Sequence, residues 1–465
     1  MTKTASEFAA ALQSGEATAT SIVEKTLERV GAYNAKLGAF TDVIKERALK
    51  CASEIDEKRA AGAVLGPLAG VPFAVKNLFD LEGLPTRAGS KINRDHPPAK
   101  EDATLVKRLE AAGAICVGTL NMGEYAYDFT GENIQDGPSR NPHNLDHMTG
   151  GSSGGSGSAV AAGLIPIALG SDTNGSIRVP ASFCGVFGLK PTYGGLSRAG
   201  TFPLSSSLDH VGPLARSTWD LAASFDAMKG HDPKDPISPE RPVVETLQAL
   251  PRGIDNLRIS IAGGFFREMQ LPDASAAVET VAGALGADTE VKVQDTKAAR
   301  GAAYLITMAE GAALHYERLK TRGDDFDVAV RERLIAGAML PAWWVQRAQK
   351  LRRIYRDRFL ALFEETDLII APSTPCVAPR IGQKEMELDG ETMPVRPNMG
   401  LFTQPISFIG FPVVSVPIWP NGSSLPIGVQ LIAAPWREDI ALRASAYLEA
   451  EGVAQAPVAA GFAAH

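Results

Sequence analysis

The stretch of sequence that decides the fold lies at residues 150–192 and reads GGSSGGSGSAVAAGLIPIALGSDTNGSIRVPASFCGVFGLKPT. Small residues let one backbone approach another backbone or a ligand closely, and consecutive Gly and Ser amides can point into one concavity. Such a concavity binds an anion, or the oxyanion that develops when an acyl group is attacked. A flexible Gly/Ser linker is the alternative, but the apolar runs LIPIALG and RVPASFCGVFG are not typical of a linker. We therefore predict a folded core that carries a binding loop.

Helical and apolar segments alternate on both sides of this stretch, which favours an α/β layered fold with a largely buried sheet. Helices are predicted in residues 5–60 and 103–114 and over most of 273–365. Short strands are predicted at residues 73–75, 115–118, 257–263, 367–375, 411–417 and 426–433.

Core strands at both ends of the sequence predict one domain, residues 1–465, with a helical insertion. A proline-rich connector at residues 232–251 leads towards that insertion. The predicted parts are an N-terminal helical region (5–60), a catalytic core with the Gly/Ser-rich stretch (61–231), a mostly helical insertion (252–366) and the C-terminal part of the core sheet (367–455).

The composition is that of an ordinary globular protein, with 45% hydrophobic and 21% charged residues and a formal net charge of -7. Disorder and a strongly basic nucleic-acid footprint are excluded on this basis. The four cysteines (Cys51, Cys116, Cys184, Cys376) have no CxxC spacing, so reduced thiols are expected. Residues 1–25 contain no unbroken apolar core, so we expect no secretory leader, and no apolar run of 18 residues occurs in the sequence. We expect a cytoplasmic protein that binds neither a membrane nor nucleic acid directly.

Serines in the glycine-rich loop are candidate nucleophiles, and they need a base. The nucleophile-elbow pattern G-x-S-x-G matches at residues 150–154 and 151–155, but its triad requires an acid and then a histidine later in the chain. No histidine lies in the strand-rich C-terminal region. A phosphate-binding P-loop is absent too, since no G-x-x-x-x-G-K-[ST] occurs. A desolvated lysine can serve as base, and Lys76 ends the apolar strand PFAV, although a surface lysine capping that strand is the alternative.

Three motifs, PFAVKNLFD (72–80), GGSSGGS (150–156) and GSDTNGSIRVPASFCGVFGLKPT (170–192), resemble the amidase signature family. The resemblance implies a single α/β domain with a central mixed, twisted β-sheet covered by helices on both faces. It also implies a Ser–Ser–Lys triad in which Ser176 forms the acyl-enzyme, Ser152 bridges, and Lys76 is the base. A cis peptide between Gly151 and Ser152 is part of the same family pattern.

The resemblance further implies an oxyanion hole formed by the amides of Thr173, Asn174, Gly175 and Ser176. Asn174 stands where relatives commonly carry glycine or alanine, which leaves the backbone donors intact. Three other family positions are occupied by Ser153, Asp172 and Arg178. Ser153 is expected to hydrogen-bond near the triad, with turn formation as the alternative. Asp172 and Arg178 are expected to be structural polar partners, with substrate contact by Arg178 as the alternative.

Within the family, segments such as AVKNLFDLEG (74–83), LNMGEYAYDFTGEN (120–133) and LFTQPISFIG (401–410) resemble the biuret/1-carboxybiuret hydrolases of cyanuric acid degradation. The resemblance implies release of ammonia from a small, urea-like carboxylated amide, with neither metal nor organic cofactor. It also implies a homodimeric core with a small helical partner protein. Tyr125, Arg140 and Gln404 are expected in segments that border the pocket, although core or loop positions are equally compatible with the sequence.

Three other functions remain open from the sequence. One is a general amidase for small aliphatic or aryl amides. Another is the amidase component of the glutamyl-tRNA(Gln) amidotransferase, which shares the triad and would need a large tRNA-binding partner. The third is a scaffold that retains an inactive amidase fold, against which the joint presence of Lys76, Ser152 and Ser176 argues.

Overall fold

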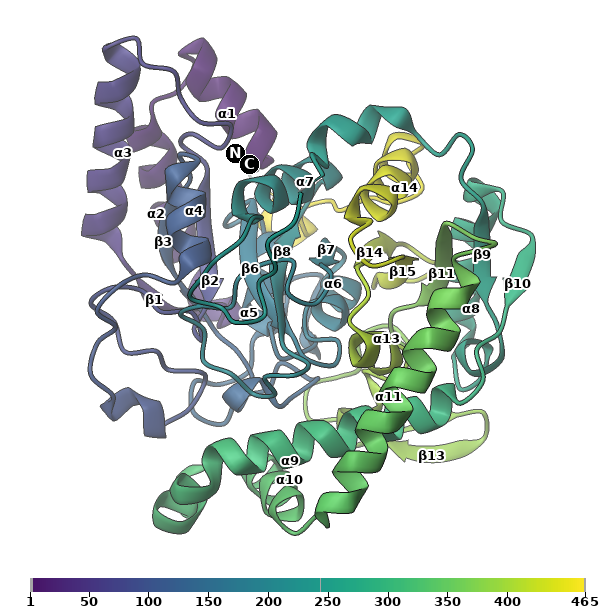
Figure 1. Cartoon of the computed structure of the whole chain (residues 1–465). Coiled ribbons are helices and arrows are strands. Elements are labelled where there is room, and N and C mark those ends of the chain that lie inside the picture. The colour runs from purple at the N-terminus through teal and green to yellow at the C-terminus, as the bar shows by residue number, and fades with distance from the viewer. Residues whose placement is uncertain (1–2, 243, 464–465) are drawn as a thin grey trace.

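The computed structural model describes residues 3–242 and 244–463 and is built around one large sheet of 11 strands (Figure 1). The spatial order is β1-β3-β2-β6-β8-β7-β14-β15-β11-β9-β10, so strands from the beginning and the end of the chain meet in the middle. The strands of this sheet are β1 (Phe40–Val43), β2 (Pro72–Lys76), β3 (Ile115–Leu120), β6 (Ile167–Asp172), β7 (Phe187–Lys190), β8 (His210–Ala215), β9 (Ile259–Ala262), β10 (Thr289–Val291), β11 (Leu368–Pro372), β14 (Val413–Ile418) and β15 (Ile427–Ala433).

The sheet is mixed, as predicted. Strand β2 runs parallel to both β3 and β6, and β9 runs parallel to both β10 and β11. The strands between these two groups pair antiparallel. Two small hairpins lie outside the sheet, β4 (Arg140–Asn141) with β5 (Asn144–Met148), and β12 (Glu385–Leu388) with β13 (Glu391–Pro394).

Helices cover both faces of the sheet, and the alternation of side chains along a strand explains how. Phe73 and Val75 of β2 pack into the core that contains α4, α7, α8 and α14, whereas Ala74 packs into the core that contains α2, α5 and α6. The helices are α1 (Ala5–Ser14), α2 (Ala19–Leu37), α3 (Lys45–Ala60), α4 (Thr104–Ala111), α5 (Gly154–Ala161), α6 (Arg178–Cys184), α7 (Thr218–Met228), α8 (Pro272–Leu285), α9 (Thr296–Arg322), α10 (Val328–Ala338), α11 (Ala342–Leu362), α12 (Val395–Asn398), α13 (Gln404–Ile409) and α14 (Glu438–Ala450).

The region predicted as a mostly helical insertion is helical from α8 to α11, but it also supplies two strands of the sheet. Strand β9 was expected as the entry to this region, whereas the three-residue β10 at the sheet edge was not. Strand β1, at the opposite edge, lies inside the N-terminal region predicted to be helical. Both strands are short and carry polar residues, so neither shows an apolar run that predicts a strand. Strands β6, β7 and β8 in the middle of the sheet were not predicted either.

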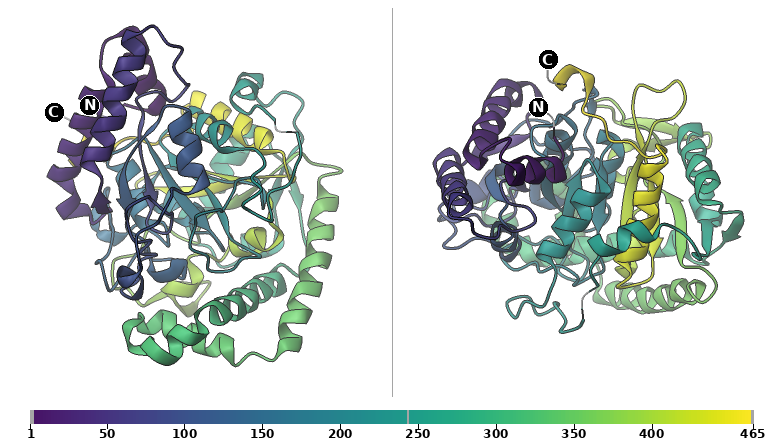
Figure 2. Two further views of the ribbon diagram at one scale, coloured as in Figure 1. Left: turned by 60° about the vertical axis from the view of Figure 1, so that its left-hand side comes forward. Right: turned by 90° about the horizontal axis from the view of Figure 1, so that it is seen from above.

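The two ends of the described chain lie close together (Figure 2). The C-terminal segment returns to α2, where the Tyr33 and Phe462 rings are 5.1 Å apart and Arg29 donates a hydrogen bond to the Phe462 carbonyl. In the part of the chain that the structure describes, no helix combines the length and the apolar character required to cross a bilayer.

Helices α9 and α10 lie at the bottom of Figure 1, and α11 packs against α9 and rises from there along the right-hand part of the molecule. Helix α10 packs closely against α9, and the contact point is Gly337 of α10. A Cβ atom at Gly337 would lie 2.1 Å from the carbonyl oxygen of Met308 on α9, so any side chain there would push the two helices apart.

We predict that Gly337→Ala destabilises the protein by about 1–3 kcal/mol, because the added methyl group overpacks the α9–α10 contact. The matched control is Gly301→Ala in α9, where a Cβ atom meets nothing within 4 Å. That change removes a flexible residue from a helix and should stabilise by up to about 1 kcal/mol. Denaturant unfolding measures both, and equal effects of the two changes would contradict the assigned contact.

Candidate active site

Lys76 lies at the carboxyl end of β2, beside the parallel strand β6. Its Nζ is 2.6 Å from the hydroxyl oxygen of Ser152 and 2.8 Å from that of Ser171. Ligands of α/β sheets commonly bind at the carboxyl ends of parallel strands, since the loops that follow them converge there. The two motifs that carry Lys76 and Ser152, 76 residues apart in the sequence, are therefore brought into direct contact.

The Lys76 side chain is completely buried. Burial removes water from the ammonium group and lowers the pKa of Lys76 to about 7, although the carboxylates of Asp172, Asp209 and Asp128 act in the opposite direction. An amine with this pKa is partly neutral near pH 7, and a neutral amine can accept a proton.

Ser152 is held in place by the segment that follows β3. The peptide bond between Gly151 and Ser152 is cis, as the family pattern implied. The Gly123 amide donates to the Ser152 carbonyl at 3.1 Å, and the Gly151 amide donates to the Phe129 carbonyl at 2.9 Å. A Cβ atom at Gly151 would lie 2.5 Å from Oδ2 of Asp128, so only glycine allows this close approach.

The loop that follows β6 carries Thr173, Asn174, Gly175 and Ser176 between the sheet and α6. Gly175 has a φ of 141°, and a Cβ atom there would lie 2.1 Å from the Thr403 hydroxyl. Within residues 3–242 and 244–463, the backbone amides of these four residues donate no hydrogen bond to the protein. Free amides that follow one another in a buried loop are suited to bind a negatively charged oxygen.

A buried ion pair fixes this loop. Arg178 donates to both carboxylate oxygens of Asp172, at 3.0 and 2.9 Å, and both side chains are fully buried. Arg178 also donates to the Thr403 carbonyl, to Oε1 of Gln430 at 2.6 Å and to the Ser407 hydroxyl. Burial alone would raise the pKa of the Asp172 carboxyl, but the adjacent guanidinium outweighs it and holds that pKa well below its usual range.

Ser176 opens into a narrow cavity whose other walls come from distant parts of the chain. Thr173 and Asn174 line it on one side, and Tyr127, Asp128 and Phe129 line it on another. Tyr304 of α9, Arg333 of α10, Pro397 and Gln404 also line it, and Ala126 and Leu204 complete the wall.

Arg333 is the cationic side chain of this cavity wall. Its Nε donates to the Ala329 carbonyl at 2.8 Å, one of its terminal nitrogens donates to the Tyr127 carbonyl at 2.6 Å, and its guanidinium lies over the Tyr127 ring. Among the described residues it forms no ion pair with a carboxylate. The guanidinium is thus fixed in position while its charge remains available to a ligand.

Two polar groups beside Arg333 are also available. The Asn174 amide nitrogen donates to the Thr307 hydroxyl at 2.8 Å, which leaves Asn174 Oδ1 buried and without a partner. Arg300 donates to Oε1 of Gln404 at 2.8 Å, so the Gln404 amide nitrogen is the group left for a ligand. The cavity therefore offers a cation, a hydrogen-bond acceptor and a hydrogen-bond donor near Ser176.

A family model described as Amidase matches residues 21–442. The chain belongs to the amidase family. It is 52% identical over 450 residues to AtzE of Pseudomonas sp. (strain ADP), a 1-carboxybiuret hydrolase subunit, covering 97% of this chain and 98% of that protein. It is 38% identical over 461 residues to the A component of the glutamyl-tRNA(Gln) amidotransferase of Chloroflexus aggregans (strain MD-66 / DSM 9485), with 93% of each chain covered.

Solved structures similar to this chain support the assignment to the amidase family. An inhibitor-bound structure of a vestigial protein complex, described as revealing the origins of an s-triazine catabolic enzyme, has a TM-score of 0.96 at 51% identity, covering 97% of this chain and 99% of that one. A bacterial aryl acylamidase of the amidase signature family has a TM-score of 0.87 at 26% identity, with 96% of each chain covered. The protein is therefore an amidase, a hydrolase of carbon–nitrogen bonds, and the inactive-scaffold interpretation is set aside.

The remaining residues singled out in the sequence lie around the amidase cavity at different distances. Ser153 is buried behind it, where its hydroxyl donates to the Ser171 carbonyl at 3.2 Å. Gln404 lies on the cavity wall. Tyr125 and Arg140 are not among the residues that line the cavity. Tyr125 packs against His315, with ring centres 4.0 Å apart, and Arg140 donates to the Leu145 carbonyl at 2.8 Å.

The polar cavity residues of the amidase that sequence reasoning missed are Tyr127, Asp128, Tyr304 and Arg333. Tyr127 and Asp128 belong to the quoted segment LNMGEYAYDFTGEN, so the resemblance marked the segment but not the correct tyrosine. Tyr304 and Arg333 lie within long helices whose periodicity shows an amphipathic face, but does not show what that face contacts.

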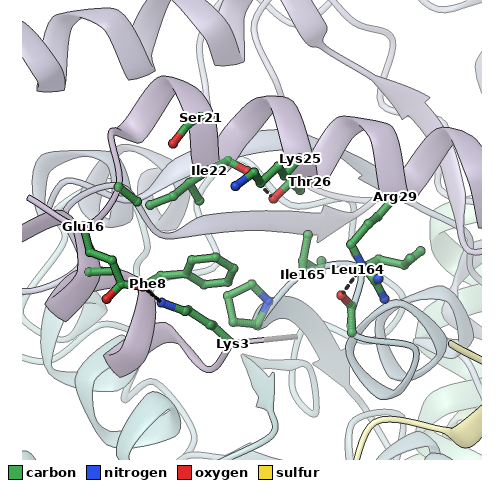
Figure 3. Close-up of a pocket in the computed structure, with 14 residues that line it drawn as sticks. Lys3, Phe8, Glu16, Ser21, Ile22, Lys25, Thr26, Arg29, Leu164 and Ile165 are labelled. Atoms are coloured by element: carbon green, nitrogen blue, oxygen red, sulfur yellow. Dashed lines mark hydrogen bonds and ion pairs between the residues drawn. The ribbon is translucent and has the colours of Figure 1, made fainter. Parts of the chain in front are cut away.

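The amidase has another cavity, far from this chemistry, between α1, α2 and residues 163–166 (Figure 3). It has a volume of about 80 Å³ and apolar walls that include Phe8 and Ile165. Its charged groups include Lys3, which contacts Glu16 at 2.7 Å, and Arg29, which donates to the Gly163 carbonyl. Its hydroxyl groups, those of Ser21 and Thr26, donate to the backbone carbonyls of Thr18 and Ile22, and among the described residues neither is hydrogen-bonded to a lysine. The Ser176 cavity is therefore the candidate active site.

Proposed function

We propose that this amidase hydrolyses a small, carboxylated, urea-like amide of the 1-carboxybiuret type and releases ammonia. The identity of 52% to a 1-carboxybiuret hydrolase supports this substrate class because it extends over 97% of the chain. The observation that carries the proposal is the position of Arg333, a fixed guanidinium without a carboxylate partner among the described residues, on the wall of the Ser176 cavity.

A carboxylated urea-like amide matches the polar groups of Arg333, Asn174 and Gln404 in this cavity. Its carboxylate would bind the guanidinium of Arg333 through a charge-assisted hydrogen bond. Its N–H groups would donate to Oδ1 of Asn174, which is otherwise buried without a partner. The Gln404 amide nitrogen would donate to a carbonyl or carboxylate oxygen. A simple aliphatic or aryl amide would leave Arg333 without a negatively charged partner, so it would bind less favourably than a carboxylated amide.

The proposed reaction is acyl transfer to water through the Lys76–Ser152–Ser176 triad. Neutral Lys76 takes a proton from Ser152 as Ser152 takes one from Ser176, and the Ser176 oxygen bonds to the amide carbon. The free amides of residues 173–176 stabilise the oxyanion of the tetrahedral intermediate, an effect worth about 3–4 kcal/mol for a strong donor. The proton returns through the same two groups to the leaving nitrogen, which departs as ammonia. Water then attacks the acyl-enzyme in the same way and regenerates Ser176.

We also propose that the amidase works with a partner protein. The relative at 52% identity is itself called a subunit, and the similar solved structure is of a protein complex. The tRNA-dependent amidotransferase remains the second candidate function, because glutamine also carries a carboxylate and an amide. Purified protein that released ammonia from glutamine faster than from carboxybiuret would favour this second candidate.

The base predicts a pH dependence. Lys76 acts when neutral, and its pKa is about 7, so kcat/KM should fall as the pH decreases through about 7 and level off above it. Lys76→Arg should be inactive, because a guanidinium stays protonated at these pH values. Lys107→Arg, a change at an exposed lysine, is the control and should keep the wild-type profile. An active Lys76→Arg enzyme would remove lysine from the mechanism.

The proposed nucleophile predicts a covalent intermediate. Ser176→Ala should fold normally but lose activity by a factor on the order of 10⁴ or more, since no acyl-enzyme can form. A fluorophosphonate probe should add its mass to Ser176, as measured by peptide mass spectrometry. Ser153→Ala is the control and should still be labelled. Label on Ser152 or Ser153 in the wild type would show that the assignment is wrong.

The proposed carboxylate contact predicts a change of selectivity. Arg333→Gln should lower kcat/KM for carboxybiuret by about ten- to a hundredfold, because a charged hydrogen bond of roughly 1.5–3 kcal/mol is lost. The activity on neutral biuret, which we expect to be lower in the wild type, should be affected much less. Arg331→Gln is the matched control, since Arg331 lies on the same helix but pairs with exposed Asp324.

Carboxybiuret for these assays is generated in place from cyanuric acid with a ring-opening hydrolase, and ammonia is measured against that enzyme alone. Equal losses on both substrates in Arg333→Gln would contradict the carboxylate contact. No ammonia above the background, together with ready cleavage of benzamide, would contradict the substrate class and leave the triad unaffected.

A further inference from the structure

A second polar hollow lies between α11 and the segments that follow β7, α13 and β15, and we call it the arginine hollow. Arg352, Arg353 and Arg356 of α11 line it, opposite Tyr193, Gly410 and Trp436. Its volume is about 400 Å³. Among the residues that the structure describes, no lining residue carries a negative charge, and none is shared with the amidase cavity. The hollow is therefore a separate, strongly cationic pocket in a chain whose net charge is -7.

Arg352 is built into the wall of the hollow. Its Nε donates to the Phe408 carbonyl at 2.5 Å and a terminal nitrogen donates to the Ser207 carbonyl at 2.8 Å. These contacts fix the guanidinium at the end of α13. Burial lowers the pKa of Arg352, but an arginine remains charged in any protein environment near neutral pH.

Arg353 and Arg356 have no such partners. Within residues 3–242 and 244–463, neither side chain forms an ion pair or a hydrogen bond, whereas Arg358 of the same helix pairs with Asp295. Arg356 is close enough to Arg352 to act against its charge, and Glu310, which accepts hydrogen bonds from Ser205 and Ser207 outside the hollow, acts in its favour. Three guanidinium groups thus converge on one concavity without a lining carboxylate to balance them, and an anion would relieve their repulsion.

The aromatic walls narrow the class of ligand. The Tyr193 ring already faces Arg198 and Arg352, at 5.2 and 5.9 Å from the guanidinium carbons. The Trp436 ring is covered by Arg241 at 4.2 Å. Each of the two rings therefore already has a guanidinium group against it. What remains for a ligand is the set of guanidinium N–H groups, which bind carboxylate and phosphate oxygens in a forked geometry.

Trp436 closes the hollow in a backbone conformation that bulky residues rarely adopt, with a φ of 69°. Its amide donates to the Thr192 hydroxyl at 2.7 Å, which joins the two segments opposite α11. The wall opposite the arginines is therefore held in one arrangement rather than left as a loose loop.

We propose that the arginine hollow binds a small oxyanion with at least two negative charges, a dicarboxylate or a phosphate, at a site distinct from the amidase cavity. The proposal does not depend on the proposed substrate. Its ligand chemistry follows from Arg353 and Arg356, which have no partner among the described residues, and from the fixed Arg352.

Isothermal titration of the full-length protein with malonate, and separately with pyrophosphate, tests this proposal. Saturable binding is expected for at least one of them, and the one that binds identifies the carboxylate or the phosphate class. The double variant Arg353→Gln/Arg356→Gln should weaken that binding at least tenfold. The control Arg347→Gln/Arg358→Gln removes the same charge from other positions on α11 and should bind as the wild type does.

Three outcomes would overturn the proposal. One is equal weakening in the two double variants, which would mean a general charge effect. Another is the absence of saturable binding, with a thermal shift no larger than sodium chloride gives at equal ionic strength. The third is loss of binding in Arg333→Gln but not in Arg353→Gln/Arg356→Gln, which would place the anion in the amidase cavity.

Discussion

The ion pair between Asp172 and Arg178 is the interaction on which the arrangement of the site depends. Asp172 ends β6, Arg178 begins α6, and the Ser176 loop lies between them. The other contacts of Arg178 reach Thr403 next to α13 and Gln430 on β15, so one side chain joins three separate parts of the chain. Loss of one partner from such a buried pair typically costs about 3–5 kcal/mol, because the other charge stays buried without compensation. The geometry of the loop and the stability of the sheet are therefore linked.

The same burial that makes this ion pair essential also lowers the pKa of Lys76. Asp172 forms an ion pair with Arg178. The negative charge of Asp172 raises the pKa of Lys76 less than burial lowers it. The sheet supplies the dry environment, since β2 and its neighbours β3 and β6 are buried along their whole length. A carboxylate hydrogen-bonded directly to Lys76 would have kept the amine protonated, and serines occupy those positions instead.

Features set by local sequence could be predicted, whereas features set by distant contacts could not. The Gly/Ser-rich loops and the apolar strand before Lys76 are local, so the contact between Lys76 and Ser152 was expected from the motifs. Arg333 and Tyr304 reach the cavity because α10 packs closely on α9 at Gly337, and periodicity within either helix does not reveal that contact. Tyr125 was expected near the pocket because its segment borders it, but Tyr127 lies on the wall and Tyr125 packs in an aromatic cluster.

The strand order has a consequence for how the chain folds. Strand β7 ends at residue 190, yet its partner β14 begins at residue 413, so one side of β7 stays unpaired until almost the whole chain has been made. At synthesis rates of about 5–20 residues per second, this delay lasts on the order of 10 s or more. During that time the first half of the sheet presents an apolar edge strand to other chains, a known route to aggregation. Because the centre of the sheet is completed last, the nascent chain must be protected from aggregation until β14 has been made.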